Sequence, residues 1–160
     1  FGPISIKAGY SYMNAQDDSF HEEAVDSQDG WAASLSWGVP SAGWYFAGEY
    51  STKTTEFYNH SEADFEQSGF EIVGKYSFAN GLSLATGYQY ERAEQGKETV
   101  KASQIPVVVE YNFNPNFKVY AQANFGVDNT KIDGKVVTED VAKPTCGEGN
   151  AFAVGARYTF

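Results

Sequence analysis

Residues 69–91, GFEIVGKYSFANGLSLATGYQYE, decide the fold class of this chain. Two stretches flank Ala79-Asn80-Gly81, and in each of them alternate positions are bulky or uncharged, from Phe70 to Phe78 and from Leu82 to Tyr90. The positions between them are mostly small, polar or charged. Such a period of two residues predicts β-strands, and an Asn-Gly pair favours a tight turn. The segment therefore predicts a β-hairpin.

The same period recurs along the whole chain, and no 3.6-residue pattern persists. We expect a single all-β domain over residues 1–160 in which antiparallel strands form a transmembrane β-barrel. Strands of about 9–11 residues suit a tilted crossing of a bilayer. The eight predicted strands cover about 4–13, 31–39, 44–53, 70–78, 82–91, 104–113, 117–127 and 151–160.

One face of every predicted strand carries no charge. Its 41 positions hold 19 of the 26 aromatic residues, and at the overall frequency of 20% about eight of the 41 would be charged. The interior of an eight-stranded barrel is only wide enough for side chains to fill it, so this many rings would overpack it. The uncharged face therefore suits lipid, where a charge costs about 2–4 kcal/mol at the midplane. The positions are the alternate residues of Ile4–Tyr12, Trp31–Val39, Trp44–Thr52, Phe70–Phe78, Leu82–Tyr90, Ile105–Phe113, Phe117–Val127 and Phe152–Phe160.

The predicted connections alternate between short and long. The short ones cover 40–43, 79–81 and 114–116, and the long, polar ones cover about 14–30, 54–69, 92–103 and 128–150. Outer-membrane barrels have short periplasmic turns and long extracellular loops, so we expect both termini on the periplasmic side. Aromatic residues near both strand ends predict two interfacial girdles. Together these features predict the cell outer membrane of a Gram-negative bacterium.

Composition and single residues exclude other classes of function. The formal net charge of -10 argues against nucleic acid as a partner. The only cysteine, Cys146, and both histidines, His21 and His60, fall in long loops without the spacing that metal ligands need. A catalytic pair His60–Ser61 lacks a rigid wall position and an orienting acid. We predict no enzyme, no catalytic residue and no metal site built by the fold itself.

Four segments carry a resemblance to a known family. The ending AVGARYTF (153–160) looks like the closing strand of outer-membrane proteins. Residues 1–18, 69–91 and 107–125, the last with its Tyr-Asn-Phe-Asn turn, resemble strands and hairpins of the general (OmpC/OmpF-like) trimeric porins, in their C-terminal half.

The resemblance implies a pore for passive diffusion of small hydrophilic solutes and ions. Porins of that family have 16 strands, so the chain is either half of such a barrel or a closed eight-stranded barrel. The resemblance also implies partners: the chain forms a homotrimer if it is a full porin, or another chain completes its barrel. Membrane lipid and lipopolysaccharide are the expected neighbours. The alternative is a non-conducting eight-stranded barrel with a structural or adhesive role. A polar lumen biases ion passage through its fixed charges.

The face opposite the lipid-facing one supplies the candidate pore-lining residues. Pro106 also lies on it, and because proline has no amide proton to donate, we expect a bulge or irregularity there. The charged candidates are Lys7, Glu49, Lys53, Glu71, Lys75, Glu91, Glu110, Lys118 and Arg157.

The loops between the predicted strands are acidic. Because Ca²⁺ and Mg²⁺ prefer oxygen ligands, we expect loop carboxylates to share such ions with lipopolysaccharide phosphates. The alternative is that they are ordinary solvated charges. The carboxylates are Asp17, Asp18, Glu22, Glu23, Asp26 and Asp29 in the first loop and Asp133, Glu139, Asp140 and Glu148 in the last.

Overall fold

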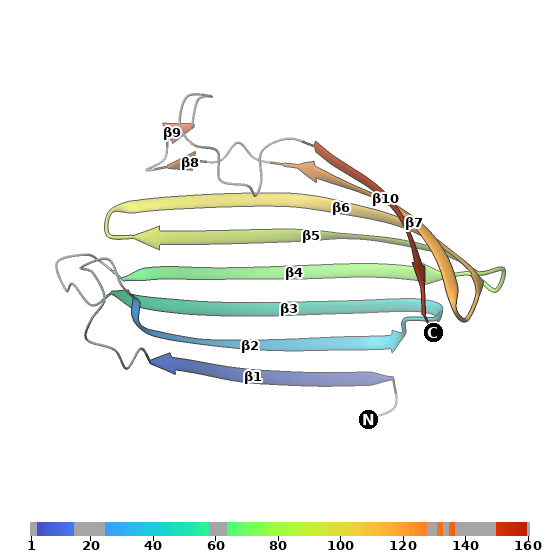
Figure 1. Ribbon diagram of the computed structural model, residues 1–160, viewed down its shortest axis with the longest axis horizontal. Coiled ribbons are helices and arrows are strands. Elements are labelled where there is room, and N and C mark those ends of the chain that lie inside the picture. The colour runs from blue at the N-terminus through green and yellow to red at the C-terminus, as the bar shows by residue number, and fades with distance from the viewer. Residues whose placement is uncertain are drawn as a thin grey trace.

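The computed structural model describes residues 3–14, 25–57, 64–127, 131–132, 135–136 and 150–159, and within these ranges every regular element is a β-strand (Figure 1). The eight predicted strands are confirmed, and two short strands join them. No helix in the described part is long and apolar enough to cross a membrane. The strands are β1 (Ile4–Asn14), β2 (Val25–Val39), β3 (Ala42–Phe57), β4 (Phe65–Ser77), β5 (Leu82–Gln95), β6 (Glu98–Asn114), β7 (Phe117–Gly126), β8 (Lys131–Ile132), β9 (Lys135–Val136) and β10 (Asn150–Tyr158).

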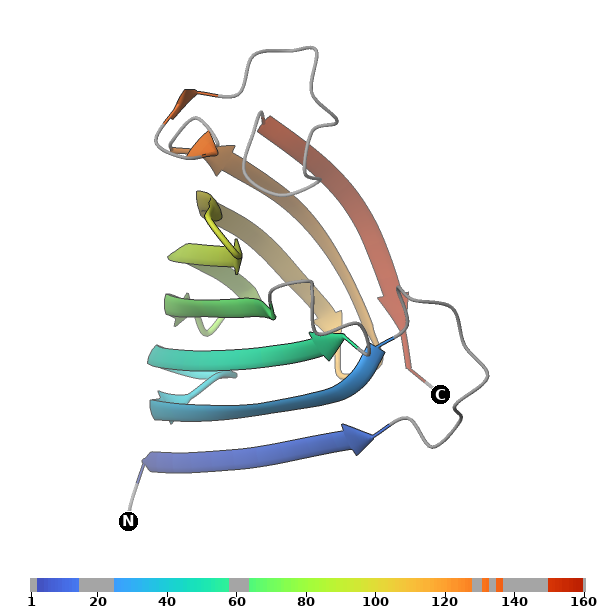
Figure 2. The same cartoon turned by 90° about the vertical axis from the view of Figure 1, so that its left-hand side faces the viewer.

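The long strands form one antiparallel sheet in chain order, β1-β2-β3-β4-β5-β6-β7-β10. Viewed from the side, the sheet follows an arc with β1 and β10 at its two ends (Figure 2). No pairing or contact joins β1 to β10 among the described residues. The sheet is therefore an open trough with two hydrogen-bonding edges. The start of β1 and the end of β10 both lie on its turn side (Figure 1).

Several strands continue beyond the predicted limits on the loop side. β2 begins at Val25 and β3 ends at Phe57. The predicted long loop over 92–103 is wrong, because β5 and β6 run on to a tight turn at Gly96-Lys97. Gly96 has φ 59°, in the left-handed region that glycine adopts without strain. In the sequence, the alternation of apolar residues ends at Tyr90 because it reflects contact with lipid. The backbone hydrogen bonds between two strands do not need lipid and also continue in water.

The three short turns at the opposite end are held by small residues and asparagines. Asn80 Oδ1 accepts a hydrogen bond of 3.1 Å from the amide of Leu82. Asn114 Oδ1 accepts bonds of 2.9 Å from the amides of both Asn116 and Phe117. These side-chain acceptors satisfy amides that the tight turns leave outside the ladders. The turns therefore fix the register of the hairpins that they close.

The register places uncharged residues beside uncharged residues on what we term the outer face. Ile6 lies opposite Leu35, and Phe70 lies opposite both Tyr50 and Tyr90. Because side chains alternate along a strand, all intervening positions share the other, inner face. None of the large hydrophobic side chains of the described part is buried, and Ile6 and Val154 are 74% and 85% exposed. Such a distribution requires a non-aqueous surrounding for the outer face.

Aromatic rings meet in two bands on the outer face. Near the turns, the ring of Trp44 lies 5.6 Å from Phe46 and 4.9 Å from Tyr76. Near the loops, the ring of Phe70 lies 5.9 Å from Tyr88 and 5.6 Å from Tyr90. These bands have the position of the two interfacial girdles that the sequence predicted.

The expected irregularity at Pro106 is present, as a gap in pairing without a shift of register. The β5–β6 ladder passes from the pair Thr86–Val107 directly to Gln89–Gln104. On its other side Pro106 keeps its pairing with Asn124 of β7. The missing proline amide thus interrupts only the β5 side of the ladder.

Gly87, at this gap, offers a test of the fold. A Cβ at Gly87 would meet the backbone carbonyl oxygen of Ile72, which cannot move without disturbing β4. Gly87→Ala is therefore expected to lower the free energy of unfolding by about 1–3 kcal/mol, measured by urea titration in detergent micelles with tryptophan fluorescence. Gly9→Ala is the control, since a Cβ there meets nothing within 4 Å. Equal stabilities of the two variants would contradict the close approach.

Candidate pore-lining surface

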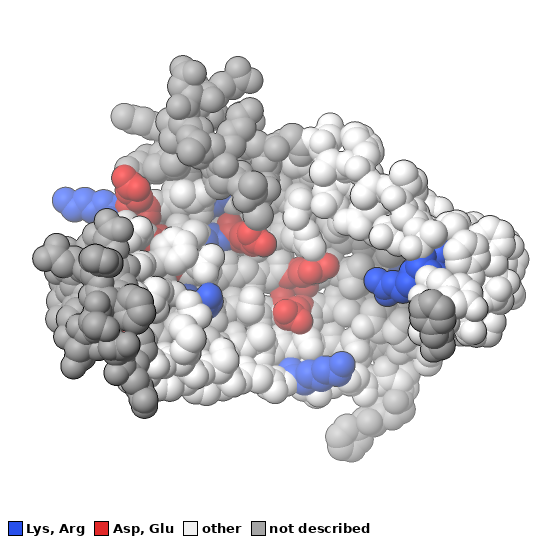
Figure 3. Space-filling model, viewed as in Figure 1, with Lys and Arg blue, Asp and Glu red and all other residues white. Residues whose placement is uncertain are grey.

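All nine charged candidates lie on the inner face, which is the concave side of the trough. Lys7 is registered with Ser34, Ser34 with Glu49 and Glu49 with Glu71, so one row of the wall joins β1 to β4. Figure 3 looks into the trough and shows charged side chains within it, with acidic groups near the centre and basic groups on both the turn side and the loop side. Strand register therefore brings together residues that are far apart in the sequence.

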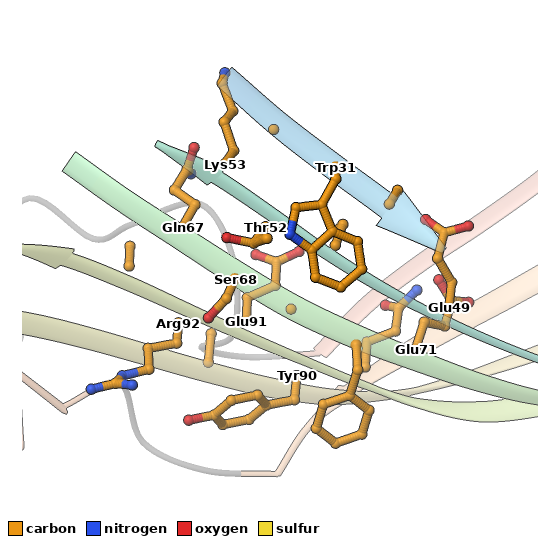
Figure 4. Close-up of a pocket in the computed structure, with 18 of the residues that line it drawn as sticks. Trp31, Glu49, Thr52, Lys53, Gln67, Ser68, Glu71, Tyr90, Glu91 and Arg92 are labelled. Carbon is orange, nitrogen blue, oxygen red and sulfur yellow. The ribbon is translucent and has the colours of Figure 1, made fainter. Parts of the chain in front are cut away.

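We define the acidic arc as Glu49, Glu71 and Glu91. Glu49 and Glu71 are direct cross-strand partners, and Glu91 lies on the next strand, opposite Gly69. The three carboxylates line a cavity of about 980 Å³ (Figure 4). No ion pair of the described residues involves any of them. Like charges directly opposite each other are destabilising, so this arrangement lowers the stability of the sheet.

The same cavity extends toward the loop side, where its charge changes sign. Lys53 lies opposite Gln67 on the inner face, and both line the cavity (Figure 4). Gln89, which follows Glu71 in the same row, donates nothing to the carboxylates; its Oε1 accepts a hydrogen bond of 2.6 Å from Gln104. The wall between the charged groups is thus polar and neutral.

We define the basic arc as Lys75, Lys118 and Arg157, which lie on the turn side. Glu110 of β6 contacts two of them, with its carboxylate oxygens 2.6 Å from Lys118 Nζ and 3.7 Å from Lys75 Nζ. Arg157 of β10 is registered directly opposite Lys118 of β7. Four strands therefore contribute to one charged group of the wall.

Small polar side chains fill the inner face between the arcs. Ser77 and Ser83 are buried, their hydroxyl oxygens are 3.0 Å apart, and Ser77 donates to the carbonyl of Pro40. Gly155 lies under the ring of Tyr120, its cross-strand partner. Small residues leave the trough hollow, whereas large ones would close it.

The sequence reasoning missed a charged rim on the outer face, above the loop-side aromatic band. Arg92 pairs with Glu94, which also accepts a hydrogen bond of 2.9 Å from Thr99. Glu66 is registered opposite Glu94. These residues were assigned to loops, although their alternation with the inward Gln67 and Ala93 was a signal that the strands continue.

Other candidates fall outside the described residues, namely Cys146, His21, His60 and most of the acidic loop residues. Asp26 and Asp29 are described and belong to β2 rather than to a loop. Within the described part, no three or more His, Cys, Asp or Glu side chains are grouped so that they could hold a metal ion.

With the fold and the polar trough established, comparisons with known proteins define the class. Residues 33–160 match the family described as outer membrane protein beta-barrel domain. Since the match covers most of the chain, the chain belongs to this family and is a protein of the outer membrane.

Particular relatives have names that agree with this class. The chain is 26% identical over 183 residues to "Outer membrane protein U" of Vibrio parahaemolyticus serotype O3:K6, covering 100% of the chain and 53% of the relative. It is 23% identical to "Porin-like protein L" of Photobacterium profundum, covering 98% of the chain and 42% of the relative. The chain thus spans about half the length of these relatives.

Solved structures show the same fold at low identity. OmpT, an outer membrane protein of Vibrio cholerae, superimposes with a TM-score of 0.72 at 18% identity, covering 99% of the chain and 52% of OmpT. A trimer form of OmpT gives a TM-score of 0.71 with the same coverage.

The assignment of the two faces can be tested at adjacent residues. Ile72, which is 54% exposed, lies on the outer face and Val73 on the inner one. Ile72→Lys is expected to destabilise the protein in lipid bilayers by about 2–4 kcal/mol, because it puts a charge in hydrocarbon. Val73→Lys is expected to cost much less, because its ammonium reaches water in the trough. Denaturant titration in phospholipid vesicles measures both, and the reverse order would contradict the sidedness.

Proposed function

We propose that this chain forms part of the wall of a diffusion porin, through which small hydrophilic solutes and ions pass passively. The observation that carries the proposal is the polar inner face: nine charged residues and many small ones line a hollow that faces away from lipid. A relative named porin-like protein supports it. The mechanism involves no chemistry, because the wall replaces part of a solute's hydration while its charges bias passage.

The open sheet supports a wide pore rather than a closed eight-stranded barrel. In hydrocarbon every backbone amide and carbonyl must be paired, yet the outer edges of β1 and β10 have no partner strand in the described part. Further strands that pair with both edges would complete a barrel, and 16 in total agrees with the roughly half coverage of the relatives. We propose a barrel of the general porin type and, because a trimer form of OmpT is known, a homotrimer.

The acidic arc supports a preference for cations at the middle of the pore. Glu49→Gln combined with Glu71→Gln is expected to lower the ratio of cation to anion permeability by about twofold or more, since uncompensated wall charge sets the local concentration of counter-ions. The measurement is the reversal potential of single channels in a planar bilayer under a KCl gradient.

The control for this experiment is Glu66→Gln, which removes a carboxylate from the outer face. It is expected to leave the permeability ratio unchanged. An unaltered ratio in the double variant would contradict the role of the acidic arc. A bilayer that shows no current steps with the unaltered protein would overturn the pore and favour the structural or adhesive alternative.

We also propose that carboxylates on the loop side share Ca²⁺ or Mg²⁺ with lipopolysaccharide. Glu66 and Glu94, in adjacent positions on the outer face above the aromatic band, add to the acidic loop residues on this side. Hard cations bridge carboxylate and phosphate oxygens.

A chelator tests the cation bridge. EDTA is expected to lower the unfolding temperature of the protein in micelles that contain lipopolysaccharide, because it removes the ions between the two acidic surfaces. Micelles without lipopolysaccharide are the control and should show no shift. Equal behaviour in both preparations would contradict the proposal.

A further inference from the structure

The basic arc places two like charges opposite each other. Arg157 and Lys118 are direct cross-strand partners on the inner face of β10 and β7. Like charges placed opposite each other destabilise a strand pair. A neutral polar residue at either position would remove the repulsion and still suit the wall, so stability does not account for this pair.

The single carboxylate nearby does not balance the arc. Glu110 is within ion-pair distance of Lys75 and Lys118, at 3.7 and 2.6 Å, and the side chains of all three are only 18–28% exposed. Three cations therefore face one anion, which leaves two positive charges. No described ion pair involves Arg157.

The described residues registered beside these side chains supply no further negative charge. Lys75 is registered with Tyr45 and Ala85, Lys118 with Asn112, and Glu110 with Ser83 and Tyr120. The wall at Gly155, two residues before Arg157, is covered by the ring of the neutral Tyr120. The surplus charge thus lies in an otherwise neutral part of the inner face, on the turn side.

We propose that the basic arc is a binding subsite for small oxyanions, such as phosphate or dicarboxylates, as they pass through the pore. This inference rests on the proposed function, because only a solute in the lumen reaches the arc. The guanidinium of Arg157 presents a fork of donors that matches two oxygens of a phosphate or carboxylate, and Lys118 and Lys75 add point charges. Glu110 holds the two lysines in place and competes with the bound anion. The wall then attracts cations at the acidic arc and oxyanions at the basic arc.

The test is a titration of the detergent-solubilised full protein with inorganic phosphate, in which broadening of the phosphate ³¹P resonance reports binding. A parallel titration with succinate is measured by calorimetry. Arg157→Gln is expected to weaken phosphate binding by roughly three- to tenfold, the effect of losing one charged donor from a solvated site. Arg157→Lys keeps the charge without the fork and should lose less. Glu110→Gln frees both lysines and should strengthen binding.

Lys101→Gln is the matched control, because it removes one positive charge from the outer face, where Lys101 lies opposite Arg92. It should leave phosphate affinity unchanged. Absence of phosphate binding by the unaltered protein, equal losses in Arg157→Gln and Lys101→Gln, or weaker binding in Glu110→Gln would each overturn the subsite. This readout needs no current, so the subsite and the pore are tested separately. A protein that conducts ions but does not bind phosphate refutes only the subsite. A protein that gives no current steps in the bilayer refutes the pore.

Discussion

The pairing of backbone amides and carbonyls in hydrocarbon is the constraint on which the rest of this structure depends. Lipid offers no hydrogen-bond partners, so a chain crosses it as a helix or as strands of a closed sheet. The register of β1 to β7 and β10 satisfies this requirement in the interior of the sheet. It also forces every second side chain toward lipid, which is why the outer face of the crossing segments excludes charge. The same constraint applies to the outer edges of β1 and β10, and it is the reason for proposing that further strands pair with them.

Backbone pairing also explains why apolar side chains lie on the outside of this sheet and polar ones on the inside, the opposite of a soluble protein. With the bulky residues committed to lipid, the inner face receives the small and charged ones, and buried residues such as Ser77 and Ser83 are polar. Register then sorts the charges by position along the strands. Glu49 and Glu71 are cross-strand partners at the middle of the wall, and Lys118 and Arg157 are cross-strand partners on the turn side. In the proposed pore, these two oppositely charged zones would act on solutes of both signs.

Sequence patterning captured the crossing part of each strand and missed what lies beyond it. From Phe70 to Tyr90 the alternation of bulky and small residues marked both strands and their faces correctly. It ended at Tyr90, whereas β5 continues to Gln95 and pairs with β6 up to Glu98. Outside the membrane either face tolerates polar residues, so the hydrophobic signal vanishes while the ladder persists. The two-residue strands β8 and β9 were missed because such short pairings leave no periodic signal.

The sequence by itself determined the two faces of the sheet and the membrane in which they belong, because contact with lipid acts on each residue separately and leaves a mark at every second position. It also put the nine charged candidates, from Lys7 to Arg157, on one face, which the strand register confirms as the inner face. Only the tertiary structure decided which of them meet. The contacts of Glu110 with Lys75 and Lys118, and the pairing of Arg157 with Lys118, join strands whose register depends on turns and backbone hydrogen bonds. Those are relations between distant segments, and no local pattern of residues encodes them.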